Sequence, residues 1–219
     1  MTNRDKVRVP APEGWMNAWG KIYREMIDQS DEDLSILDVP RPIRRLKHAL
    51  YMREIEPEGL NAVDFGCGDG KATCYLARLG CNVLGIDALP EAIEVARKRA
   101  KIVGVENRTR FVVANIGEYE VPPESYDIVS AIQTLQYLFD NTISKLRELL
   151  KAVKPGGFFA YAGNILPHFE TDPPIRFITR DELERELSGW TFHLIGSDVN
   201  LLKPEDLRGF IWVVAEKSK

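Results

Sequence analysis

Hydrophobic positions from about residue 60 onward alternate between short apolar runs and longer segments with helical spacing. Between the runs, apolar residues recur every three or four positions, as on one face of a helix. Strands joined by helices of crossover length predict an α/β fold, with a mostly parallel sheet covered by helices on both faces. Thr179 and Glu182 have the spacing of a capping box and predict a further short helix. The strand-length runs cover residues 61–65, 81–86, 110–114, 126–132, 158–162, 191–195 and 210–215.

The first 58 residues do not follow this alternation. Trp15, Trp19 and Tyr23 stand four residues apart, which places them on one face of a helix. An acidic stretch follows, and then a basic segment with helical spacing. We therefore predict an N-terminal helical cap or lid over residues 1–58 and an α/β core over residues 59–219, which together form one structural domain.

Composition narrows the class of protein without indicating its chemistry. The 219 residues carry a formal net charge of −4, which argues against a protein whose main task is to neutralise nucleic-acid phosphates. No apolar run approaches the ~20 residues needed to span a bilayer, and the polar first residues lack a signal-peptide core. We expect a cytoplasmic protein with neither a membrane nor a nucleic-acid partner. The three cysteines, Cys67, Cys74 and Cys81, predict neither a disulfide framework nor a metal site.

The strongest chemical signal is a glycine-rich loop between the first strand and the next helix. Residues 63–70 read Val-Asp-Phe-Gly-Cys-Gly-Asp-Gly, at the point where an open α/β sheet binds a nucleotide-like ligand. Asp87 ends the second strand, 21 residues after Gly66 (87 − 66 = 21), which suits a carboxylate that accepts hydrogen bonds from ribose hydroxyls. The GxGxG spacing disfavours a nicotinamide or flavin dinucleotide, whose fingerprint is GxGxxG. Asp64, two places before the first glycine, would repel a pyrophosphate but suit a cationic ligand.

This loop resembles motif I, DxGxGxG, of the class I S-adenosylmethionine-dependent methyltransferases. Further motifs follow in the family's order: Asn115 with Ile116 after the third strand, the segment 125–138 around the fourth, and a Lys-Pro-Gly-Gly turn at 154–157 before the fifth. The resemblance implies a Rossmann-like sheet of seven strands with an antiparallel C-terminal strand. It also implies S-adenosylmethionine as the cofactor and S-adenosylhomocysteine as its product.

The resemblance further implies roles for individual residues. Asp64 would interact with the amino group of the cofactor, and Asp87 would hold the ribose. Asn115 stands where the family places an acidic residue against adenine. Its oxygen can still accept a hydrogen bond from the exocyclic amine, but without the assistance of a charge. The expected cofactor-binding residues are Asp64, Gly66, Cys67, Gly68, Gly70, Asp87, Ala88, Asn115, Ile116, Ala131 and Ile132.

Methyl transfer from a sulfonium is a direct displacement, so such enzymes share no single catalytic residue. The segment after the fourth strand lacks the Asn/Asp-Pro-Pro-aromatic run of enzymes that methylate adenine, which favours a small-molecule acceptor. His168 is the candidate general base and Tyr137 a candidate catalytic residue in the pocket; a surface-loop histidine and a packing tyrosine remain the alternatives. The expected substrate or lid contacts, with packing or solvated charge as the alternative, are Trp15, Trp19, Tyr23, Arg45, Gln136 and Arg176.

Two subfamilies and two other functions remain open. The tail from residue 175 is similar to that of tellurite-resistance-type methyltransferases, and the middle of the chain to ubiquinone-biosynthesis-type methyltransferases. A protein that binds S-adenosylmethionine or S-adenosylhomocysteine without turnover is one alternative. A nicotinamide-dependent oxidoreductase is the other and is disfavoured by the loop spacing. The sequence predicts neither the acceptor nor the oligomeric state.

Overall fold

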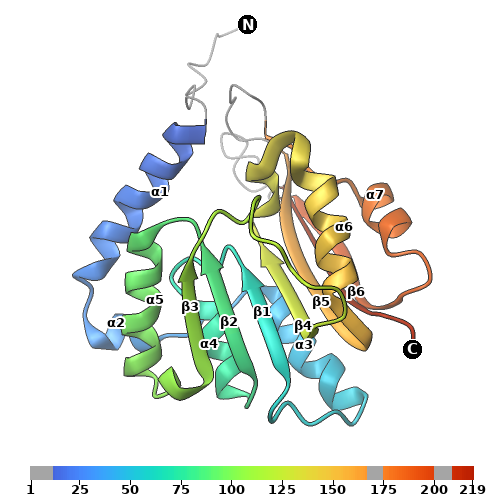
Figure 1. Ribbon diagram of the computed structural model, residues 1–219, viewed down its shortest axis with the longest axis horizontal. Helices are drawn as coiled ribbons and strands as arrows, with labels where there is room; N and C mark the ends of the chain where they lie inside the picture. Colours follow the sequence, from blue (N-terminus) through green and yellow to red (C-terminus); the bar gives the residue numbers. More distant parts are fainter. Residues whose placement is uncertain (1–11, 167–174, 200–208) are drawn as a thin grey trace, which may run out of the picture.

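The computed structural model describes residues 12–166, 175–199 and 209–219 (Figure 1). The strands in this part of the chain are β1 (Asn61–Phe65), β2 (Asn82–Asp87), β3 (Thr109–Val113), β4 (Tyr126–Ile132), β5 (Val153–Leu166), β6 (Thr191–Val199) and β7 (Gly209–Glu216). They form a seven-stranded sheet with the order β3-β2-β1-β4-β5-β7-β6. Neighbouring strands are parallel except that β7 is antiparallel to both β5 and β6. The predicted mostly parallel sheet with an antiparallel C-terminal strand is therefore confirmed.

Helices form the N-terminal segment and most of the connections between strands. The helices among the described residues are α1 (Pro12–Ile27), α2 (Asp31–Ser35), α3 (Arg41–Met52), α4 (Lys71–Arg78), α5 (Pro90–Ile102), α6 (Thr142–Ala152) and α7 (Arg180–Glu186), with 3-10 turns η1 (Glu106–Arg108) and η2 (Leu135–Asn141). The predicted capping box is present at the start of α7, where Thr179 and Glu182 bond each other's backbone amides. None of the described helices is both long and apolar enough to cross a membrane.

Helices cover the sheet (Figure 1), and each face of the sheet carries its own hydrophobic core. Successive strand residues point to opposite faces, so β1 contributes Ala62 to one core and Val63 to the other. Side chains of α3, α4 and α5 fill the first core, and those of α6 and α7 fill the second. This packing holds the carboxyl ends of β1, β2 and β4 at one edge of the sheet, where the glycine loop begins.

The N-terminal helix packs on α5. α1 runs beside α5 and extends beyond the carboxyl ends of the parallel strands (Figure 1). Lys98 of α5 donates to the backbone oxygens of Ile27 and Gln29, at 3.0 Å each, and Glu91 pairs with Arg24. In contrast, α3 is part of the first core. The proposed boundary between cap and core near residue 58 stays a prediction.

Besides η1, two short elements were not predicted from the sequence. α2 forms in the acidic stretch, where the Ser30 hydroxyl accepts a hydrogen bond from the Asp33 amide at 3.1 Å and caps the helix. η2 follows β4 and includes Phe139 at a positive φ of 50°. Neither segment is long enough to show a helical period, which is why the hydrophobic pattern does not reveal them.

Candidate active site

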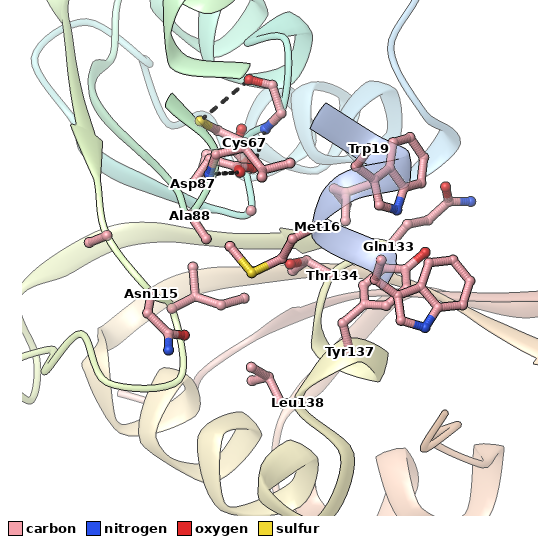
Figure 2. A pocket seen from close by; sticks show the side chains of 18 of the residues that line it. Met16, Trp19, Cys67, Asp87, Ala88, Asn115, Gln133, Thr134, Tyr137 and Leu138 are labelled. Carbon is pink, nitrogen blue, oxygen red and sulfur yellow. Dashed lines mark hydrogen bonds between the residues drawn. The ribbon is translucent and has the colours of Figure 1, made fainter. Parts of the chain in front are cut away.

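A cavity of about 890 Å³ lies at the carboxyl ends of β1, β2 and β4, with α1 forming one wall (Figure 2). Its size is typical of small-molecule and cofactor sites. Thirteen of the residues expected from the sequence line it, drawn from α1, the glycine loop and the strand ends. They are Trp15, Trp19, Tyr23, Asp64, Gly66, Cys67, Gly68, Asp87, Ala88, Asn115, Ile116, Ile132 and Tyr137.

The first two glycines of the loop allow close approach by other parts of the chain. Gly66 has φ 66°, and a Cβ there would lie 2.1 Å from the Thr134 hydroxyl oxygen. Gly68 has φ 53°, and a Cβ there would lie 2.5 Å from the Tyr23 hydroxyl of α1. A side chain at either position would meet both a strained backbone and an occupied space. The loop therefore presents bare backbone to the cavity.

Gly70 has a different role from the other two glycines. Its φ is 77°, and a Cβ there would lie 2.8 Å from the Cβ of Ala96 in α5. The position does not line the cavity, so this glycine serves the packing of the loop against the helix rather than contact with a ligand.

Asp64 is a buried carboxylate beside the cavity. It is 1% exposed, and its two oxygens accept hydrogen bonds from the hydroxyls of Thr73 and Ser130, at 2.7 Å each. Burial raises the pKa of Asp64 to about 6, although both hydroxyls act to lower it. Because these hydroxyls are neutral and no described lysine, arginine or histidine pairs with Asp64, its ionised form has no compensating cation in this part of the chain. The site therefore fits a positively charged group such as the amino group of an amino acid.

Asp87 has structural hydrogen bonds that the sequence did not predict. One oxygen accepts from the Gly68 amide at 2.9 Å and the other from the Leu89 amide at 3.0 Å. Burial is the main cause that raises the pKa of this carboxyl, and the backbone donors oppose it. Each carboxylate oxygen can accept a second hydrogen bond. Asp87, which also interacts with the Ala88 amide, can therefore hold the glycine loop in place and still accept from a ribose hydroxyl.

Asn115 is bonded within its own loop. Its side-chain oxygen accepts from the Gly117 amide at 3.0 Å, and its amide group donates to Glu118 at 3.0 Å. The neighbouring Ile116 is buried and lines the same part of the cavity. The Asn115 oxygen has a second lone pair, so the predicted contact with an adenine amine is compatible with this turn.

The comparisons with known proteins agree with this geometry. Residues 63–161 match the family described as methyltransferase domain. The chain carries a class I S-adenosylmethionine-dependent methyltransferase domain. The cofactor of this domain is S-adenosylmethionine, and the donor set fits it: the bare loop faces the cavity, Asp64 fits an ammonium group and Asp87 retains acceptors for a ribose.

Relatives of known function match the domain over part of their length. Methyltransferase GfsG of Streptomyces halstedii is 33% identical over 119 residues, which cover 54% of this chain and 42% of the relative. Ubiquinone biosynthesis O-methyltransferase of Methylobacterium sp. (strain 4-46) is 38% identical over 101 residues, which cover 46% of this chain and 39% of the relative. This chain thus matches about two fifths of the length of each relative. The resemblance to tellurite-resistance-type methyltransferases stays a prediction.

A solved structure shows the same fold as the methyltransferase domain. The S-adenosylmethionine-dependent methyltransferase from Mesorhizobium loti superposes with a TM-score of 0.59 at 21% sequence identity. The match covers 83% of this chain and 100% of that chain. At this level of identity the likeness concerns the fold alone.

Aromatic side chains of α1 close one side of the methyltransferase cavity. The ring centroids of Trp15 and Tyr137 are 4.9 Å apart, and the rings of Trp19 and Tyr23 stack at 6.0 Å. Burial raises the pKa of the Tyr137 hydroxyl, against the effect of side-chain hydrogen bonds from Trp19 and Gln136. Tyr137 is therefore a neutral phenol at pH 7 whose oxygen is held by α1 and by η2.

Several expected residues lie outside the cavity wall. Ala131 and Gln136 are buried behind it, and Gln136 supports Tyr137. Arg45 of α3 donates to the backbone oxygen of His193 at 3.0 Å. Arg176 pairs with Glu182 in α7. Neither arginine lines the cavity of the methyltransferase domain, and His168 lies outside the described residues.

The wall also contains residues that sequence reasoning missed. Gln133 and Thr134 directly follow β4, and Gln133 has a positive φ of 54°. Their place at the carboxyl end of a central strand is the signal that could have marked them. Met16 lies on α1 between the ring positions and points into the cavity (Figure 2). The remaining missed residues of the wall are Asp38, Pro40, Asp69, Lys71, Ala72, Leu89, Val113, Ala114, Gly117, Glu118, Leu138, Phe139 and Asn141.

Proposed function

We propose that the protein transfers a methyl group from S-adenosylmethionine to a small-molecule acceptor. The observation that carries this proposal is the pair of carboxylates on the glycine-loop cavity, of which Asp64 is fully buried and Asp87 partly buried. Asp64 offers a negative charge that no cation among the described residues compensates, which suits the cationic amino end of the cofactor. Asp87 accepts from backbone amides and keeps acceptor capacity for a ribose hydroxyl. A pyrophosphate would be repelled by the same charges, which disfavours a nicotinamide cofactor.

Two further observations support a small acceptor. The relatives that match the domain include a ubiquinone biosynthesis O-methyltransferase, which is named for a small-molecule pathway. The cavity is walled on one side by α1, with Trp15 against Tyr137, which suits a compact ligand more than a nucleic-acid strand. The net charge of −4 points in the same direction.

The residues of this chain would act by binding, orientation and exclusion of water. When bound, S-adenosylmethionine supplies an electrophilic methyl group. Asp64 and Asp87 would orient the two ends of the cofactor, and the aromatic wall of α1 would keep water from the reacting atoms. Tyr137 is neutral at pH 7, so it would donate a hydrogen bond to the acceptor rather than remove its proton. His168 stays the predicted general base.

A transfer assay with labelled methyl groups tests the proposal. Wild-type protein would be incubated with methyl-labelled S-adenosylmethionine and a panel of small phenols, amines, thiols and carboxylates, beside the Asp87→Ala variant. We expect label in at least one class of acceptor with the wild type and much less with the variant, which binds the cofactor more weakly. Tight binding of S-adenosylhomocysteine without transfer to any class would instead indicate a non-catalytic binding protein.

A further inference from the structure

Arg99 in α5 is a fully buried arginine whose function the fold alone does not explain. It is 1% exposed and lies on the helix face that also carries Ala96 and Ala100, both in the first core. Burying a guanidinium requires it to give up hydration, and an apolar side chain at such a position is often at least as stabilising. Stability of the core alone therefore does not account for an arginine at this position.

All three nitrogens of Arg99 are used, and they reach in two directions. On one side, Nε donates to the backbone oxygen of Asp69 at 2.9 Å, and Nη2 pairs with the Asp69 carboxylate at 2.8 Å. On the other side, Nη1 donates to the backbone oxygens of Leu34 and Ile36, the second at 3.1 Å. One side chain thus joins the glycine loop to the end of α2.

The loop end of this link lies in the cofactor site. Asp69 stands between Gly68 and Gly70, both at positive φ, and lines the cavity. Arg99 holds both its carbonyl and its carboxylate, so the direction of this peptide is set by the arginine. Lys71 also pairs with the Asp69 carboxylate, at 3.2 Å, but it does not contact α2 in any interaction that the described residues show.

The other end of the link lies outside the site. Among the described residues, none of α2 lines the cavity. Leu34 is fully buried, and the chain then runs past Ile36 to Asp38 and Pro40, which do line the cavity. Arg99 therefore provides a route from the glycine loop to α2 that does not require the ligand to touch α2 itself.

We propose that Arg99 is a positioning residue that couples cofactor binding at the glycine loop to the docking of the N-terminal segment. This inference rests on the proposed function, because it concerns the same cofactor site. By linkage, a cofactor that stabilises the loop stabilises the docked α2 by the same factor, and a docked α2 tightens cofactor binding.

The neighbouring Lys98 provides a matched control. Its Nζ donates to the backbone oxygens of Ile27 and Gln29, so it also ties the N-terminal segment to α5. Within the described residues, its side chain forms no hydrogen bond or ion pair with the glycine loop. Lys98→Met therefore removes an anchor of the N-terminal segment alone, whereas Arg99→Lys keeps a charge but cannot span both partners.

The test combines titration calorimetry with hydrogen exchange of the α2 amides. The amides of Asp33, Leu34 and Ile36 are hydrogen-bonded in the structure and can report docking. We expect S-adenosylhomocysteine to slow their exchange in the wild type and in Lys98→Met but not in Arg99→Lys. Its dissociation constant should rise about 5- to 100-fold in Arg99→Lys and clearly less in Lys98→Met, which loosens the N-terminal segment but leaves the loop contact of Arg99 intact.

Three outcomes would overturn the inference, and they separate it from the proposed function. Wild-type protein that binds S-adenosylhomocysteine without any change in α2 exchange refutes the coupling alone, and this comparison stands even if Arg99→Lys does not fold. Equal loss of affinity in Lys98→Met and Arg99→Lys shows that anchoring, and not the loop contact, is responsible. Wild-type protein that does not bind S-adenosylhomocysteine overturns both proposals.

Discussion

Burial and hydrogen bonding act in opposite directions on the Asp64 carboxylate. Burial raises its pKa to about 6, and the hydroxyls of Thr73 and Ser130 oppose that rise without cancelling it. Because the folded-state pKa lies above the unfolded value, the folded protein binds more protons between about pH 4 and pH 6. The stability that Asp64 contributes is therefore present at low pH and is lost as pH rises through about 6. The proposed binding of an amino group requires the ionised carboxylate, which is the form that burial disfavours.

This opposition predicts the effect of Asp64→Asn. Because an amide does not titrate, raising the pH from 4 to 7 should destabilise only the wild type at this position. The difference in the free energy of unfolding, variant minus wild type, should therefore rise by roughly 2–3 kcal/mol over this range. Affinity for S-adenosylhomocysteine should fall at pH 7.5, because the amide offers the amino group no charge. Urea unfolding at the two pH values and calorimetry measure the two effects. A variant that is less stable at pH 7 but binds normally would contradict this account of Asp64.

The glycines of the loop can be tested against a glycine in open space. Gly59 has φ 79° with no atom within 4 Å of a built Cβ, whereas Gly66 has φ 66° and would collide with Thr134. Gly59→Ala should lose about 1–2 kcal/mol of stability from backbone strain alone and bind S-adenosylhomocysteine normally. Gly66→Ala should lose more stability and bind weakly, and a second change, Thr134→Gly, which removes every side-chain atom that the new Cβ meets, should restore part of both. Equal behaviour of the two single variants would refute the close approach.

At the scale of elements, α1 and η2 together form the wall of the cavity beside the strand ends. Trp15 of α1 packs on Tyr137 of η2, while α5 anchors the other end of α1 through Lys98 and Glu91. The wall therefore depends on contacts between segments far apart in the sequence. The aromatic stripe of α1 identified the helix and its inner face, but not its partner.

The contact between α1 and η2 can be measured by a double-mutant cycle. Trp15→Ala and Tyr137→Ala should each lower stability and speed the dissociation of S-adenosylhomocysteine. The coupling between them in the free energy of unfolding should be about 0.5–1.5 kcal/mol, as for other aromatic pairs. Ile22→Ala, on the exposed side of the same helix at 44% exposure, is the control and should leave dissociation unchanged. A coupling of zero would mean that α1 does not depend on Tyr137.

Local patterns predicted most elements because their causes are local. The apolar runs marked each strand of the sheet within a few residues, and the capping box at Thr179 marked α7. The glycine loop and Asp87 were visible as a spacing. The positive φ of Gln133 and the hydrogen bonds of Arg99 to two separate segments could not be predicted from the sequence. Both depend on tertiary contacts, which the residue type does not indicate.

At the scale of the whole molecule, the N-terminal segment and the α/β core contribute different parts of the site. The sheet edge supplies the glycine loop and both carboxylates, and the N-terminal segment supplies the aromatic wall. The first 58 residues contain an acidic stretch and then a basic segment, and the structure shows where the basic side chains lie. Basic residues of α3 bind outside the cavity, as Arg45 does at His193, and Arg41 lies 4.5 Å from the centroid of the Trp212 ring. Among the described residues, the carboxylates and amines on the cavity wall are five acids and one lysine, Lys71.

The central claim is that the glycine-loop cavity binds S-adenosylmethionine through Asp87. Titration calorimetry of the wild type and of Asp87→Ala with S-adenosylhomocysteine, and of the wild type with NAD, tests it most directly. We expect the wild type to bind S-adenosylhomocysteine and not NAD, and the variant to bind about 1.5–3 kcal/mol more weakly. Binding of NAD alone, or an affinity for S-adenosylhomocysteine that Asp87→Ala leaves unchanged, would contradict the claim.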